Sequence, residues 1–500
     1  MDKRITCLLS ALALTALGCG KSASAGNGSG TGGAELRFGF TSEPATLDPV
    51  SSSNTADSRS ILFNVFEGLV KPDTDGNCVP AVAESYTIEQ GGLVYRFVIR
   101  KDIVFHDGSP VRAADAVFTI EEAVKAGFSG FTQIAGAVAE GERGLLLTLK
   151  APDPEFLPYL TIGIVPAGNP DREKNPVGTG PFMIKSYTAQ QNMVLEKNPL
   201  YWQEGFPKLD RVTIVFLANS DALLLALRGG NIDGATITGA LAPQIDTAVF
   251  DMLPNPSNAV QLLALNNAVK PLDDIRVRRA INHAVDIPRI IEAAFYDRGE
   301  PSGSPLIPGL SLYYESGLKT PYAFDPGRAK SLLAEAGYAE GFPLEITVPS
   351  NYTMHVDTAQ VIVEQLSRSG IRASIKLVDW ATWLSEVYRG RNYQATVISL
   401  DANNVSPRSF LSRYLSDAGG NFLNYQSEAY DRTYNAAQNE ADEGKRAALY
   451  RDAQKIISGD AAAVYIQDIL GFRAFPKGQF GGTRNYPLYV EDFSAVYRIN

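Results

Sequence analysis

The chain has 500 residues, of which 45% are hydrophobic and 20% are charged, and its formal net charge is −10. This composition is typical of a folded globular protein, and the length predicts roughly two to four domains. The negative charge argues against a nucleic-acid partner, because phosphate backbones bind basic surfaces.

The first residues have the pattern of an export signal. Lys3 and Arg4 precede an apolar run, 5–17, which is too short to span a bilayer and suits a signal-peptide core. The run ends in a segment that resembles the lipobox of bacterial lipoproteins, Ala16-Leu17-Gly18-Cys19, with Ala16 where a leucine is usual. We therefore predict a signal peptide over 1–18 and a lipid on Cys19. The alternative is a plain secretory signal with an incidental cysteine.

The next segment has the composition of a tether. Residues 20–33 are almost all Gly, Ser, Ala, Thr and Asn, so we assign 19–33 to a flexible tether. No later stretch is long and apolar enough to span a membrane, which leaves the lipid as the only expected attachment. Cys7 would leave with the signal and Cys19 would be acylated, so only Cys78 remains and no internal disulfide is expected.

Strand and helix signals alternate along the rest of the chain. Residues 95–99 and 212–216 are predicted to be largely buried strands. Asp325-Pro326 predicts a helix start, because Asp caps free N–H groups and Pro suits the first turn. Apolar residues at i, i+3, i+4 and i+7 then lead to Gly337, and 277–284 repeats this spacing.

The clearest unit is a helix, a strand and a helix between 357 and 389. A helix over 358–368 is followed by alternating polar and apolar residues over 371–377, which predict a strand. Asp379 can then cap a helix that begins at Trp380. This alternation predicts layers of helices and strands, which is an α/β fold.

Eight segments, in this order, together resemble the large periplasmic solute-binding proteins of the peptide, opine and nickel importer family (solute-binding protein family 5). They cover nearly the whole mature chain. They are EPATLDP (43–49), NVFEGLV (64–70), PAVAESY (80–86), 95–118 with RKDIVFHDG, PVGTGPF (176–182), KNPLYW (197–202), RVRRAIN (276–282) and the helix after Asp325.

The resemblance implies a two-lobed periplasmic-binding-protein fold of type II, cluster C, with a small extra domain on the first lobe. The small domain would be 78–175 and the second lobe 265–473, and the first lobe would combine three segments, 34–77, 176–264 and 474–500. Two short crossings, at 263–266 and 472–475, would let the lobes close as a hinge around a ligand.

Most motif residues are expected to be architectural. Gly178 and Gly180 suit a tight turn that needs positive φ. His106 lies at a predicted strand end and turn, and we interpret it as a turn histidine with satisfied hydrogen bonds rather than a ligand.

Ligand-binding residues are expected in loops that follow strands, where open α/β sheets bind ligands. Trp380 matches an aromatic residue that lines the cleft in dipeptide-binding relatives, although core packing is the alternative for this tryptophan and its neighbour. By position in the family we nominate three places, which are Asn54 with Thr55, then Tyr352, then Trp380 and Trp383 with Asp401, Asn403 and Asn404.

The charges expected in a dipeptide site are partly missing. Peptide-binding relatives hold the ligand's amino group with an Asp that falls on Asn403 here, while Asp401 lies two residues earlier. An Asn cannot supply the charge that a buried ammonium requires, although a shifted loop could present Asp401. Some relatives hold the carboxylate with an Arg near 350, and 350–355 has none. Longer peptides, held by backbone pairing, or another solute remain.

Signatures of metal binding and catalysis are absent from the sequence. His106, His283 and His355 lie far apart, so no metal and no cofactor are expected, while a nickel chelate held through its organic part stays open. There is no Gly-x-Ser-x-Gly, His-Glu-x-x-His or P-loop, and the Gly-x-Gly-x-x-Gly pattern at 28–33 precedes the first strand. A secreted hydrolase is therefore a distant alternative.

The resemblance implies a lipoprotein that is not an enzyme. It would be a monomer, lipid-anchored on the periplasmic side of a bacterial membrane, that captures a solute and delivers it to an ABC importer permease. A peptide is the first expectation for the ligand. An opine, an oligosaccharide or a nickel chelate is an alternative ligand, and sensing without transport is an alternative role.

Overall fold

A computed structural model describes residues 34–51, 56–128, 130–239, 241–402, 404–488 and 490–499. The chain from Ala34 onward forms one compact unit. The predicted signal peptide, the tether and Cys19 lie outside the described residues, as do Asn54, Thr55 and Asn403.

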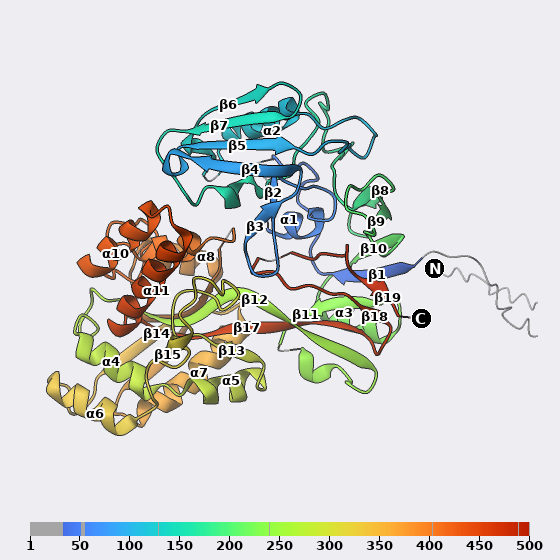
Figure 1. Cartoon of the computed structure of the whole chain (residues 1–500). Helices are drawn as coiled ribbons and strands as arrows, with labels where there is room; N and C mark the ends of the chain where they lie inside the picture. Colours follow the sequence, from blue (N-terminus) through green and yellow to red (C-terminus); the bar gives the residue numbers. More distant parts are fainter. Residues whose placement is uncertain are drawn as a thin grey trace, which may run out of the picture. The chain divides into compact units, whose positions relative to one another are not determined.

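One long mixed sheet runs through the unit (Figure 1). Its strands follow the order β15-β14-β16-β12-β17-β11-β1-β10-β9-β8, and β13 adds to β17. Their bounds are β1 Glu35–Phe40, β8 Phe182–Thr188, β9 Asn192–Lys197, β10 Arg211–Phe216, β11 Gly234–Ile237, β12 Phe250–Leu265, β13 Gly299–Pro301, β14 Pro343–Pro349, β15 Arg372–Val378, β16 Ala395–Leu400 and β17 Ala463–Pro476. The strands predicted over 212–216 and 371–377 are confirmed as β10 and β15.

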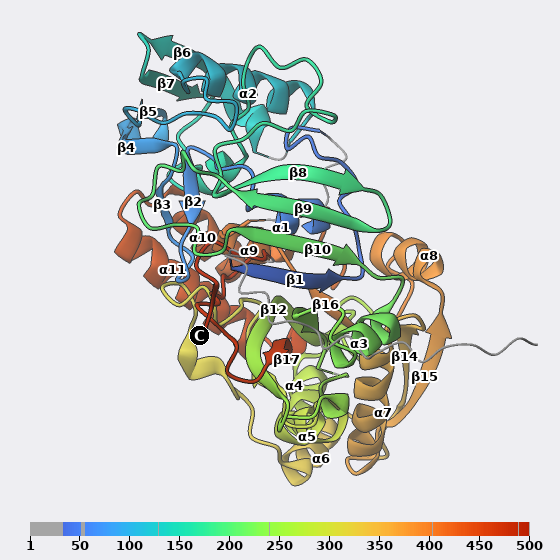
Figure 2. The same ribbon diagram turned by 90° about the vertical axis from the view of Figure 1, so that its right-hand side faces the viewer.

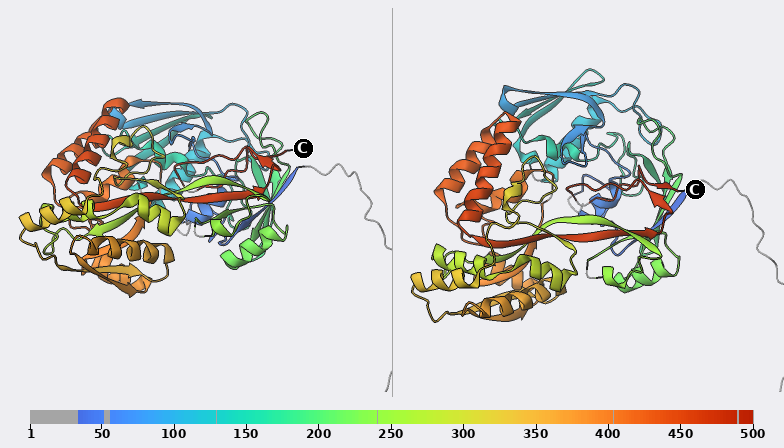
Figure 3. Two further views of the ribbon diagram at one scale, coloured as in Figure 1. Left: turned by 90° about the horizontal axis from the view of Figure 1, so that it is seen from below. Right: turned by 60° about the horizontal axis from the view of Figure 1, so that its bottom comes forward.

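Two strands, β12 and β17, connect the two halves of this sheet and pair with each other over most of their length (Figure 3). At one end β17 pairs with β11, and at the other end β12 pairs with β16 through Val260–Leu265. Their mutual register is irregular between Pro256 and Val260. A register break weakens the ladder locally, so the strand pair can bend there most easily. The lobe bounds remain a proposal, and this break precedes the expected crossing at 263–266.

The first half of the sheet is a run of β8, β9, β10 and β1 that is visible edge to edge in Figure 2. Its hydrophobic core includes Leu36, Phe38, Leu195 and Ile214. The helices of this half are α1 (Ala56–Leu62) and α3 (Ser220–Arg228), and a short pair of strands, β18 (Phe480–Gly481) and β19 (Tyr497–Arg498), lies near the C-terminus.

The second half of the sheet is covered on both faces. Along β12, Leu263 and Leu265 pack into one hydrophobic cluster, whereas Leu262 and Ala264 pack into another, as the two-residue period of a strand requires. The first cluster lies under α4 (Ile275–Ala284), α5 (Ile287–Phe295), α6 (Pro326–Glu335) and α7 (Thr353–Ser367). The second lies under α9 (Pro407–Leu411), α10 (Glu428–Asn439) and α11 (Glu443–Gly459). The predicted α/β layers are therefore confirmed.

The predicted helix starts are also confirmed. Asp325 caps α6 by accepting a hydrogen bond from the backbone N–H of Arg328 at 2.8 Å, and Ala329, Leu332 and Leu333 are buried as their spacing predicted. The helix predicted over 277–284 is α4.

A separate small sheet forms the upper part of Figure 1. Its order is β4-β5-β7-β6, with bounds β4 Ala83–Glu89, β5 Val94–Ile99, β6 Ile134–Glu140 and β7 Gly144–Leu149. Helix α2 (Ala113–Lys125) packs on it over a core that includes Tyr95 and Phe97. The strand predicted over 95–99 is confirmed as β5. A hairpin of β2 (Val70–Pro72) and β3 (Cys78–Pro80) adjoins this region.

Short 3-10 turns complete the chain, at Gln90–Gly92, Phe131–Gln133, Leu157–Thr161, Ala242–Gln244, Ser316–Leu318 and Ser412–Tyr414. Of the described helices, none has the length and apolar character needed to cross a bilayer.

The positive-φ prediction for two motif glycines is wrong. Neither Gly178 nor Gly180 has positive φ. The backbone before β8 instead passes very close to the segment after α1. A Cβ on Gly178 would lie 2.1 Å from the carbonyl oxygen of Val65, and one on Gly180 would lie 2.6 Å from that of Asn64. The missing Cβ matters here for close approach of two backbones rather than for a turn.

Candidate ligand-binding cleft

A cleft of about 1220 Å³ lies within the compact unit. It is lined by α1 and the segment after it, the β2–β3 hairpin, two loops of the small-sheet region, the second half of the long sheet, and the C-terminal segment between Arg484 and Ser494. This volume lies above the range of about 300–1,000 Å³ that is usual for small-molecule sites, and the lining mixes aromatic with charged side chains.

An aromatic pair on the second half of the sheet, the aromatic platform, consists of Trp380 and Trp383. Their rings stack with centroids 5.1 Å apart and planes 5° from parallel. Trp383 is 2% exposed and donates from Nε1 to Thr396 Oγ1 at 2.9 Å, whereas Trp380 is 37% exposed. Trp383 is thus a core residue that supports the ring of Trp380, which lines the cleft.

The local backbone explains how the platform forms. Asp379 caps the first turn by accepting from Thr382 N at 3.0 Å, as predicted. The helix expected from Trp380 changes character, because α8 ends at Thr382 and a π-helix covers Trp383–Arg389. In a π-helix, residues five apart face one another, and the ring of Tyr388 accordingly stacks near Trp383 at 6.1 Å.

Asp401 lies after β16 on the cleft wall, with an exposed side chain. Arg413 donates from Nη2 to the backbone oxygen of Asp401 at 2.6 Å. Arg59, from α1, is near enough for Asp401 to act on it electrostatically. Burial lowers the pKa of Arg59, and Asp401 opposes that shift. An acidic and two basic side chains therefore meet at this part of the cleft.

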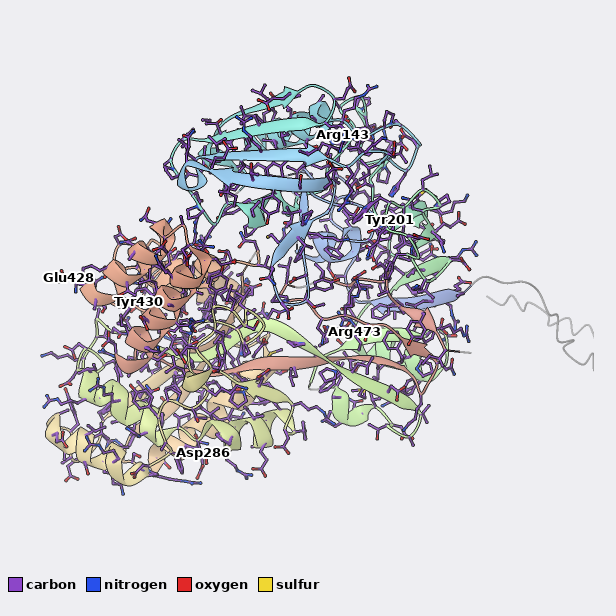
Figure 4. The ribbon with its side chains drawn as sticks, viewed as in Figure 1. Arg143, Tyr201, Asp286, Glu428, Tyr430 and Arg473 are labelled. Atoms are coloured by element: carbon purple, nitrogen blue, oxygen red, sulfur yellow. The ribbon has the colours of Figure 1, made fainter. Side chains whose placement is uncertain are left out.

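A buried carboxylate, Glu67, organises the edge of the cleft near the hairpin. It accepts from Lys71 Nζ at 3.0 Å, from the Tyr201 hydroxyl at 2.8 Å and from Trp202 Nε1 at 2.7 Å. We call these four residues the Glu67 cluster, and Figure 4 labels Tyr201 within it. The cluster joins two sequence motifs, 64–70 and 197–202, and three of its members, Glu67, Lys71 and Tyr201, line the cleft.

The C-terminal lining is held from below by a buried ion pair. Arg473, labelled on β17 in Figure 4, donates from Nε to Glu491 at 2.6 Å, and both side chains are almost fully buried. Its Nη1 also donates to the backbone oxygen of Arg484 at 3.1 Å. The strand that connects the sheet halves therefore also positions a cleft wall.

The remaining predicted site residues are placed as follows. Asn404 lines the cleft, and its side-chain oxygen accepts from the Ser409 hydroxyl. Tyr352 contacts Trp380 edge-on, with ring centroids 5.4 Å apart, and of the described residues it is not one that lines the cleft. The structure thus brings Trp380, Trp383, Asp401 and Asn404 to one cavity, and Tyr352 reaches it only through its contact with Trp380.

Sequence reasoning missed several parts of the lining, among them Arg59 and the segment after α1, the β2–β3 hairpin, the small-sheet loops with Phe128 and Tyr159, and the C-terminal segment. The pattern Gly127-Phe128-x-Gly130-Phe131 places aromatic residues in a glycine-rich loop, and this was a usable signal. Arg59 and the C-terminal segment carry no comparable local signal.

The histidine interpretation is confirmed for His106. Its Nδ1 accepts from Gly178 N at 3.2 Å and its Nε2 donates to the carbonyl of Gly180 at 3.1 Å, which satisfies both ring nitrogens. No described His, Cys or Met lines the cleft, and in the described ranges no three His, Cys, Asp or Glu side chains gather in a way that could hold a metal ion.

The sequence profile of the bacterial extracellular solute-binding proteins, family 5 (middle region), matches residues 77–422. The chain belongs to this family. Family 5 proteins bind solutes outside the cytoplasm for ABC importers, so this protein is a solute-binding protein and not an enzyme. The expected two-lobed α/β fold is confirmed.

Several known proteins are similar to this chain. Heme-binding protein A of Haemophilus influenzae is 26% identical over 509 residues, which cover 92% of this chain and 91% of that protein. Glutathione-binding protein GsiB of Escherichia coli O1:K1 is 29% identical over 357 residues, covering 68% and 69%. The periplasmic binding protein DppA of Helicobacter pylori, solved with the peptide STSA, is 25% identical with a TM-score of 0.71, covering 93% and 98%.

Proposed function

We propose that this family 5 protein is a lipoprotein, anchored through Cys19 on the periplasmic side of a bacterial membrane, that captures a peptide in the cleft and delivers it to an ABC importer permease. The choice of a peptide rests on one observation. The same cavity holds the exposed ring of Trp380, which stacks on the buried Trp383, and side chains of both charges. A peptide presents apolar side chains, planar amides and two opposite end charges, and this lining offers a partner for each.

Asp401 is the proposed partner of the ligand's amino group. Its side chain is exposed on the cleft wall, and a carboxylate can neutralise the charge of an ammonium that loses its water on binding. Arg59 and Arg413 lie close by, and either guanidinium can receive a carboxylate of the same ligand. The cleft volume of about 1220 Å³ leaves room for more than a dipeptide, which agrees with the missing Arg in 350–355.

The names of the relatives support a peptide as the ligand, and they also suggest haem as an alternative ligand. Glutathione is itself a small peptide, and DppA was solved with the peptide STSA. Heme-binding protein A covers more of this chain than GsiB does, and a haem would also suit the indole face. No described His, Met or Cys lines the cleft, so haem iron would have to bind one of its tyrosines, Tyr159, Tyr201, Tyr388 or Tyr486, and we favour the peptide.

A ligand screen tests the proposal. The purified protein is mixed with glutathione, the tetrapeptide Ser-Thr-Ser-Ala, longer peptides, haem, an opine, an oligosaccharide and a nickel chelate, and its melting temperature is measured. A bound ligand raises the melting temperature by mass action, so peptides at millimolar concentration are expected to raise it. A rise with haem, opine, oligosaccharide or nickel chelate alone would replace the peptide, and no rise at all would count against solute capture.

The lipid anchor has its own test. In cells, Cys19→Ser is expected to remove the protein from the membrane fraction and to abolish incorporation of a labelled fatty acid, because the acceptor thiol is gone. Incorporation that persists in Cys19→Ser would refute the anchor and leave the plain secretory signal.

A further inference from the structure

Two carboxylates of the small-sheet region reach the second half of the long sheet. Asp153 and Glu155 lie between β7 and the turn Leu157–Thr161, and both meet the guanidinium of Arg408 on α9. Arg408 Nη1 donates to Asp153 Oδ2 at 2.7 Å, and its Nη2 donates to Glu155 Oε2 at 3.4 Å. The side chains of Arg408, Asp153 and Glu155 are only 14%, 12% and 4% exposed.

Two hydroxyl groups complete this group of residues, which we call the interdomain cluster (Asp153, Glu155, Ser406, Arg408 and Tyr450). Ser406 donates to Glu155 Oε1 at 3.3 Å, and the Tyr450 hydroxyl on α11 donates to Glu155 Oε2. Burial raises the pKa of Glu155, while Arg408 and Tyr450 oppose that shift. Both oxygens of a nearly inaccessible carboxylate are therefore bound by groups from the other domain.

The carboxylates stand on a fixed base. The backbone N–H of Asp153 donates to the carbonyl of Gly92 at 3.0 Å, and the Tyr95 hydroxyl donates to the carbonyl of Asp153. Gly92 has φ +94, and a Cβ there would lie 2.6 Å from the Asp153 carbonyl carbon. The segment is thus held tightly against the small sheet, and its acidic side chains cannot move far without it.

Both sides of the cluster continue directly into the cleft wall. After Glu155 the chain supplies Pro158, Tyr159 and Ile162 to the lining, and from Arg408 onward it supplies Ser409, Ser412 and Arg413. The cluster therefore lies at the point where two lining segments from different domains meet.

We propose that Asp153 and Glu155 are positioning residues for the cleft, because through Arg408, Ser406 and Tyr450 they hold the lining segments 158–162 and 408–413 next to each other. This inference rests on the proposed solute capture, and it adds a task for the small domain, which is to fix one wall of the cleft. A buried ion pair contributes little net stability, since desolvation offsets its attraction, but its hydrogen bonds can fix geometry. Both oxygens of Glu155 and both terminal nitrogens of Arg408 are bound here, and among the described residues only Arg408 Nε in this cluster lacks a partner.

Hydrogen exchange of the purified protein without added solute tests the inference. Asp153→Asn keeps the shape of the side chain and removes its charge, which leaves Arg408 with an incomplete set of acceptors. We expect backbone amides in 157–162 and 408–414 to exchange about tenfold faster, with the rest of the chain unchanged. Tyr450→Phe removes one hydroxyl and leaves every charge, so it is less disruptive to folding. It is expected to give a smaller increase in amide exchange rate in the same segments.

Asp233→Asn is the matched control. The Asp233 carboxylate accepts two hydrogen bonds from the Arg37 guanidinium, at 2.7 and 3.0 Å, and one from the Arg37 backbone N–H at 2.9 Å. Both partners lie in the first half of the sheet. Asp233→Asn should leave exchange in 157–162 and 408–414 unchanged. Unaltered exchange in those segments in both Asp153→Asn and Tyr450→Phe would overturn the inference, and so would a uniform increase along the chain. The measurement needs no ligand, so a failed solute screen would remove the proposed function without changing this result.

Discussion

Two regions of the cleft are built in opposite ways. The aromatic platform comes from one short segment, in which Asp379, Trp380 and Trp383 are neighbours in sequence. The Glu67 cluster joins residues more than 130 positions apart and depends on two backbones passing in close contact. The first can be recognised from local sequence, whereas the second exists only after the whole domain has folded.

This contrast explains what the sequence predicted. The cap at Asp379, the strand β15 and the helix α6 follow from local patterns, and they were foreseen. Trp380 was nominated from its position in the family, and the structure places it on the cleft lining. The order of the family motifs predicted the fold. The π-helix was missed because its sequence also suits an ordinary helix, and no simple residue pattern separates the two.

Features that depend on distant segments were predicted poorly. Gly178 and Gly180 were assigned to a turn, because the chain that approaches them, at Val65, is far away in sequence. Arg59 became a cleft residue only because α1 approaches the loop after β16. Tyr352 stays a prediction as a ligand-binding residue; it contacts Trp380 edge-on. Asn54, Thr55 and Asn403 stay predictions.

The largest effect is expected from the core half of the platform. Trp383→Ala should lower the free energy of unfolding by about 4 kcal/mol, because it removes a fully buried ring and leaves Thr396 without its donor. Urea unfolding followed by circular dichroism measures this change. A loss below about 1 kcal/mol would mean that the ring is not needed as a support, and the local account of the platform would fail.

Acid should act on both regions through buried histidines. Burial lowers the pKa of His106, beside Gly178, and of His355, in α7, from 6.5 to about 4. The unfolded chain then binds more protons than the folded chain between those values, so stability falls as the pH drops from about 6.5 to about 4, by about 3 kcal/mol per histidine. Above pH 6.5 the contribution is constant.

The pH prediction is measured by urea unfolding of the wild type and of His355→Asn at pH 7 and pH 4.5. Asn offers an oxygen near the position of Nδ1, which accepts from Gln261 at 3.1 Å. The difference in free energy of unfolding between the wild type and His355→Asn should be smaller at pH 4.5 than at pH 7, because only the wild type loses the contribution of His355. An equal gap at both pH values would contradict a lowered pKa at this site.

In the region assembled from distant segments, Glu67→Gln should cost about 2 kcal/mol. The amide keeps the size of the carboxylate but loses the charge that faces Lys71, and its NH2 group cannot accept from Trp202 or Tyr201. Thermal and urea unfolding, followed by circular dichroism, give the change. Glu67 and Trp383 have different hydrogen-bond partners, so combining this substitution with Trp383→Ala should give additive losses. A clear departure from additivity would show that the two regions are coupled.

The smallest effect on stability, and the most specific one on binding, is expected for the exposed half of the platform. Trp380→Ala should lower the free energy of unfolding by about 1–2 kcal/mol, less than Trp383→Ala, because the ring is 37% exposed but loses its stacking on Trp383 and its edge contact with Tyr352. Affinity for whichever ligand the screen identifies should fall by about 1–3 kcal/mol, since an exposed indole on a rigid support is the lining feature best suited to anchor a ligand. Isothermal titration calorimetry measures the loss, and Trp380→Phe, which keeps an aromatic face, should recover part of it. Unchanged affinity in a stable Trp380→Ala variant would separate the platform from ligand binding and shift attention to Asp401 and the two arginines near it.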